Sequence, residues 1–291
     1  MPTTQPDAAA HVIGSLPWLV VALIAMWAMG VFRHRSIEGP PRLGPGVPAR
    51  PLFLVALLGG GAWLFSHIAY GSLRAAQFSE SHPGQTFGSK YLTGLDYALL
   101  STIPPLLGLI VLVVGDRLAA RGLLRRVGYG LSRLPGGLLF GALAMVVVVP
   151  LMIGASSLLE GLYQLTDYRH PPAHEVLTAM KKGSTAQRAA LIFGATIAAP
   201  LFEELLFRGH IQTLLSRLFQ FQSSGRSHAW LAVIMASIPF ALVHPLWTTP
   251  LIFLLALCLG YAYERTGNLW VPIVMHALFN TGSTIVFLYF G

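Results

Sequence analysis

The sequence has few charged residues and a single cysteine, and these two scarcities exclude several classes of protein. Charged residues make up 10% of the 291 residues, whereas hydrophobic residues make up 54%. Soluble domains carry about 25% charged residues, so the composition indicates a membrane protein. Cys258 alone excludes an internal disulfide framework and a cysteine-cluster metal site. The net charge of +8 comes without a basic patch interleaved with aromatics, which argues against nucleic acid as a partner.

The N-terminus lacks the basic segment of a cleavable signal peptide. Residues 1–11 include Asp7 but no lysine or arginine, and an apolar run follows at 12–32. A transmembrane helix needs about 20 apolar residues. The run therefore predicts a first transmembrane helix.

Similar apolar runs recur along the chain, and none shows the alternating pattern of membrane barrel strands. Because lipid cannot satisfy backbone polar groups, such runs predict helices. The expected fold class is all-α, a polytopic transmembrane helical bundle of about eight spans. The predicted spans are 12–32, 51–70, 97–115, 137–158, 189–210, 229–246, 250–263 and 269–290.

Arginines concentrate in every second connection, which predicts how the chain is oriented. The positive-inside rule places these connections in the cytoplasm and both termini outside. Short loops without appended domains favour a multi-pass protein of a prokaryotic plasma membrane. Segment 211–222 has apolar residues at helical spacing, which predicts that the fifth helix continues beyond 210. The arginines of these connections are Arg33, Arg35, Arg42, Arg50, Arg117, Arg121, Arg125, Arg126, Arg133, Arg208, Arg217 and Arg226.

Two adjacent acids in the fifth span are out of place in lipid, where a charge at a helix centre costs about 2.5–3.5 kcal/mol. Glu204 and Arg208 are four residues apart and share a helix face, so they can pair. Glu203 points about 100° away and is left for general-base chemistry. The alternative is a packing ion pair with a second acid that reaches the cytoplasm. Pro200 predicts a kink just before the acids.

Two later spans carry the other polar groups. Phe240 and His244 share a face of the sixth span, and His276 and Asn280 share a face of the eighth. Each pair alone is compatible with a structural role. Together with Glu203, however, these groups can activate a water molecule and stabilise an oxyanion, which indicates hydrolysis of a peptide or ester.

Other signatures of membrane proteases are missing. The stretch HEVLT has Thr178 where the zinc motif needs its second histidine. No pair of aspartates lies inside the predicted spans, and no serine stands in a nucleophile-elbow context. A covalent route is therefore disfavoured.

The three motifs E-E-x-x-x-R, F-x-x-x-H and H-x-x-x-N, in this order, resemble those of the CAAX protease and bacteriocin-processing family. This family, also called the abortive-infection family, contains the type II CAAX prenyl endopeptidase. The resemblance covers about 189–285, and the stretch YERTGNLW before the last span is also similar. We accordingly divide the chain into N-terminal helices at 1–188 and a catalytic core at 189–291.

The resemblance implies a role for each motif residue. Glu203 would activate the attacking water with help from His244, and His276 and Asn280 would stabilise the oxyanion. Glu204 and Arg208 would hold the site together, with Phe240 packed beside it. No cofactor is expected.

A divalent metal such as zinc remains an alternative, and its ligands would be Glu203, His244 and His276. The expected partners are the lipid bilayer and a membrane-associated protein or peptide substrate. Two other functions stay open: an ion-coupled membrane transporter, and a non-catalytic immunity or scaffold member of the same family.

Overall fold

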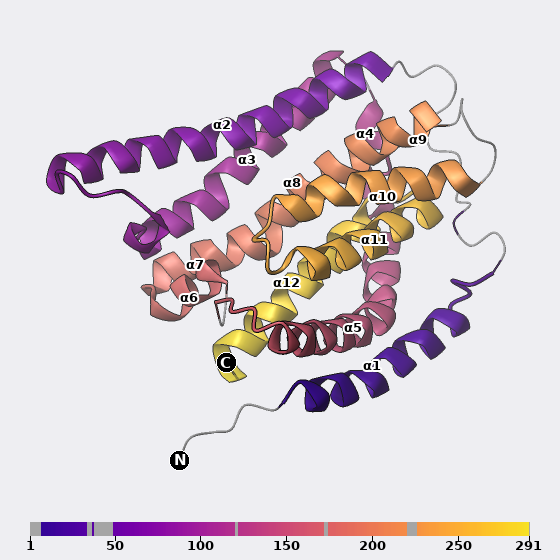
Figure 1. Ribbon diagram of the computed structural model, residues 1–291. Coiled ribbons are helices and arrows are strands. Elements are labelled where there is room, and N and C mark those ends of the chain that lie inside the picture. The colour runs from indigo at the N-terminus through magenta and orange to yellow at the C-terminus, as the bar shows by residue number, and fades with distance from the viewer. Residues whose placement is uncertain are drawn as a thin grey trace. The chain divides into compact units, whose positions relative to one another are not determined.

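A computed structural model describes residues 7–33, 37, 49–119, 122–171, 174–219 and 226–290, and these residues form helices without any strand (Figure 1). The expected all-α fold class is thereby confirmed. Arg35, Arg42 and Arg121, which contribute to the orientation argument, lie outside the described residues.

Within the described residues, six helical runs are long and apolar enough to cross a membrane, which identifies a multi-pass membrane protein. The two shortest predicted spans correspond to α10 (Arg226–Leu242) and α11 (Thr249–Thr266), with 17 and 18 residues. The six runs are Ala8–Ala28, Ala49–Ser81, Gly94–Ala119, Leu123–Leu165, Thr185–Phe219 and Trp270–Phe290.

The chain forms two compact units that interleave along the sequence. The first unit comprises Met1–Arg42, Gly128–Pro172 and Leu215–Met275, and the second comprises Leu43–Val127, Ala173–Leu214 and His276–Gly291. Each unit therefore contains residues from both sides of the expected boundary at 188/189.

In the first unit, α1 (Ala8–Ala28) lies along α5 (Leu134–Leu165), and α10 lies along α11. The Ser157 hydroxyl of α5 donates to the His11 carbonyl of α1 at 2.9 Å. The short helix η2 (Leu131–Arg133) precedes α5, and Arg133 donates to the Gly267 carbonyl at 2.9 Å. The start of α5 is thereby fixed to the turn that follows α11.

In the second unit, α2 (Ala49–Ser81) and α3 (Gly94–Ala119) lie side by side (Figure 1). Their polar ends meet at the buried Asp96, which accepts hydrogen bonds from Tyr70 at 2.5 Å and from the Thr93 amide at 2.7 Å. Arg74 completes the cluster with its Nε 2.9 Å from Asp96 Oδ1. A buried carboxylate with these partners fixes the position of α2 along α3.

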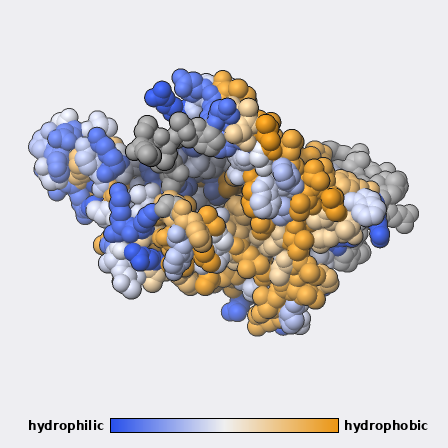
Figure 2. Space-filling view, turned by 90° about the horizontal axis from the view of Figure 1, so that it is seen from below, coloured by the Kyte–Doolittle hydropathy of each residue, from blue (hydrophilic) through white to orange (hydrophobic). Residues whose placement is uncertain are grey.

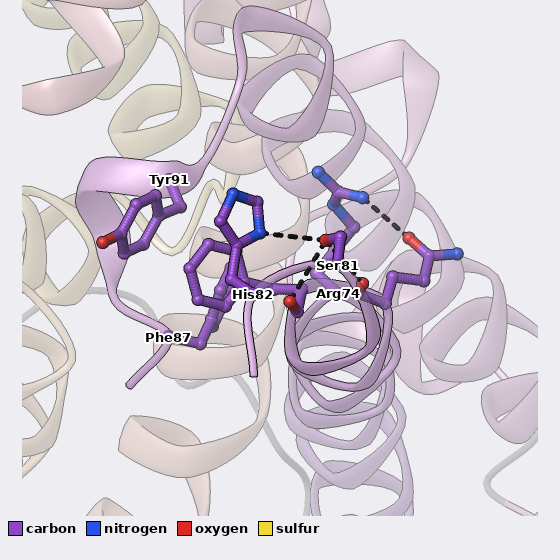
Figure 3. A pocket seen from close by; sticks show the side chains of 7 residues that line it. Arg74, Ser81, His82, Phe87 and Tyr91 are labelled. Atoms are coloured by element: carbon purple, nitrogen blue, oxygen red, sulfur yellow. Dashed lines mark hydrogen bonds between the residues drawn. The ribbon is translucent and has the colours of Figure 1, made fainter. Parts of the chain in front are cut away.

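A small pocket of about 240 Å³ lies at the same end of α2, next to η1 (Ser89–Tyr91). Figure 3 shows the rings of His82, Phe87 and Tyr91 beside the end of the helix, with Ser81 bonded to His82 at 2.9 Å. None of the motif residues lies in this pocket. Its aromatic contacts hold the connection between α2 and α3 in place.

The helix that carries the two acids is one near-continuous run and belongs to the second unit as far as Leu214. The four-residue α4 (Leu123–Arg126), the short α6 (Glu175–Lys182) and the last helix from His276 onward also belong to this unit. A capping box on Ser184 starts the run, which continues to Phe219. The predicted continuation of the fifth helix is thus confirmed as far as Phe219. The run consists of α7 (Thr185–Phe193), η3 (Gly194–Ala198), α8 (Ala199–Glu204), η4 (Leu205–Gln212) and α9 (Thr213–Phe219).

Large apolar side chains remain exposed on the helices, as lipid contact requires. Trp27, Phe65 and Leu118 are exposed, and Figure 2 shows hydrophobic residues over much of the face in view. A soluble protein of this size would bury most such surface.

Close packing of α3 against α8 requires a glycine at position 108. A Cβ atom there would lie 2.3 Å from Cε2 of Phe202, the residue before Glu203. Phe202 is 1% exposed and also stacks on Trp63 of α2, so its ring has little freedom to move. The first of the two acids is thereby placed by packing on its neighbour.

We expect Gly108→Ala to reduce the free energy of unfolding by about 1–3 kcal/mol, because the added methyl overpacks the Phe202 ring. Gly61→Ala is the matched control, since a Cβ at Gly61 in α2 meets no atom within 4 Å. Thermal unfolding in detergent micelles should show a lower Tm for the first variant and an unchanged or higher Tm for the second. Equal Tm values for the two variants would contradict the packing account.

Candidate active site

The two acids of the motif lie between two π-helical segments. α8 ends at Glu204, η3 precedes it, and η4 follows directly. Wider π turns are rare in proteins and occur most often at functional sites. In η3, the N–H of Ala199 bonds to the Gly194 carbonyl, five residues back, instead of the carbonyl four residues back.

This shift leaves the Ala195 carbonyl without its helical donor. The N–H of Ala199 is used elsewhere, and the next residue, Pro200, has no N–H to give. The Asn280 side chain of α12 (Trp270–Phe290) supplies the bond, donating from Nδ2 to the Ala195 carbonyl at 2.8 Å. Pro200 thus creates an acceptor, and Asn280 uses it to tie α12 to the helix of the acids.

Glu204 forms the centre of the buried cluster. Its Oε1 accepts from Nη1 of Arg208 at 3.1 Å, so the ion pair expected from their spacing is present. The same oxygen lies 2.9 Å from Nδ1 of His276. Because a carboxylate can only accept, Nδ1 of His276 carries a proton, and Glu204 sets the orientation of the imidazole ring.

Glu203 differs from its neighbour in both partners and exposure. Its Oε2 is buried and makes no hydrogen bond within the part of the chain that the structure describes. Nε2 of His276 lies 3.9 Å from this oxygen, which is too long for a hydrogen bond. The Glu203 side chain is 17% exposed whereas that of Glu204 is 0% exposed, so Glu203 is the acid that a water molecule or substrate can reach.

The basic groups of the site lie beside its acids. Arg208 pairs with Glu204 at 3.1 Å, and His276 has Nδ1 2.9 Å from Oε1 of Glu204 and Nε2 3.9 Å from Oε2 of Glu203. Acidic and basic side chains placed together are the arrangement that a low-dielectric membrane interior tolerates best.

The π geometry of η4 also buries His210, which the sequence reasoning did not single out. Its Nδ1 lies 2.8 Å from the Leu205 carbonyl five residues back, and its side chain is fully buried. In the same way, Thr213 donates to the Arg208 carbonyl at 2.9 Å. The sequence signal for His210 was its position in an apolar run, two residues after Arg208.

Phe240 and His244 belong to the first unit, whereas the cluster around Glu204 belongs to the second. His244 follows the end of α10, with Nδ1 2.8 Å from the Phe240 carbonyl and the two rings 5.4 Å apart. The F-x-x-x-H motif therefore forms a local contact. The structure brings Glu203, Glu204, Arg208, His276 and Asn280 into the second unit.

The donor set of the second unit does not fit a zinc site. Zinc takes at least three protein ligands. Within the described part of the chain, no group of three or more His, Cys, Asp or Glu residues is placed to hold a metal. Nδ1 of His276 and Oε1 of Glu204 are bonded to each other, whereas Nε2 of His276 lies 3.9 Å from Glu203 and Oε2 of Glu204 has no hydrogen-bond partner among the described residues.

Comparison with known families supports the resemblance seen in the motifs. Residues 185–282 match the family described as type II CAAX prenyl endopeptidase Rce1-like. Comparison with curated proteins and with solved structures gave no match. The resemblance is thus confirmed over this segment, which contains all the motif residues and at family level supports a CAAX-type intramembrane protease.

The two acids should respond differently to the same substitution. Glu204→Gln removes the negative charge from the buried 3.1 Å ion pair with Arg208, and we expect a loss of about 3–5 kcal/mol in the free energy of unfolding. Glu203→Gln removes no hydrogen bond and should change stability by less than about 1 kcal/mol. Unfolding of both variants in the same detergent measures the difference. Equal losses would show that Glu204 does not carry the ion pair.

A second pair of substitutions tests the Asn280 contact. Asn280→Ala leaves the Ala195 carbonyl unpaired, which should cost about 1–3 kcal/mol of stability. In a Pro200→Ala background, residue 200 regains an N–H that can reach this carbonyl, so the same substitution should cost less. A double-mutant cycle by thermal unfolding measures this coupling, and strictly additive losses would contradict it.

Proposed function

We propose that this protein is an intramembrane endopeptidase that hydrolyses a peptide bond near the end of a lipid-anchored or membrane-inserted protein. One observation carries the proposal: Glu203 has a carboxylate oxygen with no hydrogen bond to any described residue, 3.9 Å from a histidine that Glu204 holds in position. A free base beside an oriented imidazole is the arrangement that activated-water chemistry needs.

In the proposed reaction, Glu203 takes a proton from a water molecule while the water oxygen attacks the scissile carbonyl. The carbonyl oxygen becomes an oxyanion, which accepts from Nε2–H of His276 and from the second amide hydrogen of Asn280. The C–N bond then breaks, and the proton on Glu203 passes to the leaving amine. The family motif also implies a part for His244 in activating the water, and because His244 belongs to the first unit, this role stays a prediction.

Arg208 and Glu204 act in this scheme through other residues. Their ion pair is buried, with side chains 1% and 0% exposed, so neither group is offered to a substrate. Glu204 instead orients His276, and Arg208 holds the Glu204 carboxylate through their ion pair. Preorganised donors of this kind can stabilise a transition state without rearrangement.

The membrane setting supports the proposed class of substrate. Glu203 lies on one of the six runs long and apolar enough to cross a bilayer, and the Rce1-like match covers this run. A peptide bond reaches such a base when the substrate itself is held in the bilayer by a lipid group or an apolar segment. The cleaved protein can be identified directly by sequencing the new chain ends that cleavage produces.

We expect Glu203→Gln to reduce cleavage by about 10²–10⁴-fold, the contribution of a general base. The assay compares membrane proteomes of cells that express the wild type or the variant and sequences the new protein termini. Glu80→Gln, an exposed acid in α2, is the matched control and should keep full activity. Undiminished cleavage by a folded Glu203→Gln protein would refute the assignment.

A further inference from the structure

The first unit contains an apolar cavity that the proposed chemistry does not use. Its volume is about 460 Å³, within the range of about 300–1,000 Å³ typical of ligand sites. Its walls come from α1, α5, α10, α11 and the first turns of α12, and they include Met26, Phe140, Val147, Leu254 and Met275. Such a surface suits a hydrocarbon chain and offers water almost no partner.

Two arginines lie beside Gly30, which follows the end of α1. Arg265 lines the cavity from the last turn of α11 and donates to the Met29 and Gly30 carbonyls, both at 3.4 Å. The Arg33 side chain covers the same glycine, since a Cβ at Gly30 would lie 3.0 Å from Cδ of Arg33. Both arginines are exposed and add positive charge at this end of the cavity.

We propose that this cavity binds an anionic phospholipid, with one acyl chain between the helices and the phosphate against Arg33 and Arg265. The apolar walls supply the energy of chain burial. The guanidinium groups suit a phosphate, which they can bind through paired hydrogen bonds. The arginine end coincides with the connection after α1, one of the arginine-rich connections that the positive-inside rule assigns to the cytoplasmic leaflet, where anionic lipids gather.

The charge distribution favours a phospholipid over other occupants. A purely apolar segment of another protein would make no use of the positive charge of the two arginines. A small soluble anion would leave the apolar walls unfilled. An amphiphile with a long chain and one anionic head matches both ends of the cavity.

The test uses the purified full-length protein in detergent, with phosphatidylglycerol or phosphatidylcholine added as defined probes. We expect phosphatidylglycerol to co-purify, to be seen by native mass spectrometry, and to raise the Tm more than phosphatidylcholine does. Arg33→Gln, which leaves the contacts of Arg265 intact, should weaken phosphatidylglycerol binding roughly fivefold, as one arginine near an anionic surface contributes. Equal binding of the two lipids by the wild type would overturn the proposal.

A second variant tests the cavity itself. Ala262→Phe fills the cavity from α11 and should reduce binding of both lipids, whereas Leu139→Phe, an exposed position of α5 outside the lining, should leave binding unchanged. Unchanged binding by a folded Ala262→Phe protein would overturn the proposal, as would co-purification of a peptide in place of phospholipid. Cleavage activity is not part of these readouts, so the outcome is independent of the proposed peptidase function.

Discussion

The buried charge of Arg208 is the constraint on which the candidate site depends. A guanidinium that is 1% exposed inside an apolar helical run needs a counter-charge, and Glu204 provides it one turn earlier. Because the same Glu204 oxygen also binds His276, the ion pair determines where the imidazole of α12 lies. Oε2 of Glu203 has no hydrogen-bonded partner in the described ranges, and its distance from Nε2 of His276 leaves room for a reacting group.

A backbone irregularity serves the same arrangement. Pro200 cannot donate to the Ala195 carbonyl, and the π turn before it directs the Ala199 amide elsewhere, so Asn280 becomes the donor. α12 is therefore tied to the helix of the acids twice, through Asn280 and through His276. The side-chain distances of the site are set by these two contacts, which lie on one helix four residues apart.

The helix periodicity of the sequence was enough to predict the all-α fold and the Glu204–Arg208 pair, since residues four apart meet on any helix. It could not predict that His276 binds Glu204, because contacts between helices depend on tertiary packing. Helix periodicity also could not predict the π segments or the Ala195–Asn280 bond. Hydropathy reports which runs prefer lipid and not which runs pack together, so it did not indicate the interleaved units.

The coupling between Glu204 and Arg208 is the most direct test of this account. We would measure the free energy of unfolding of Glu204→Gln, Arg208→Met and the double variant in one detergent. The account predicts that each single variant loses about 3–5 kcal/mol, because each removes one charge of the buried ion pair, and that the double variant regains most of this loss. Losses that simply add in the double variant would contradict it.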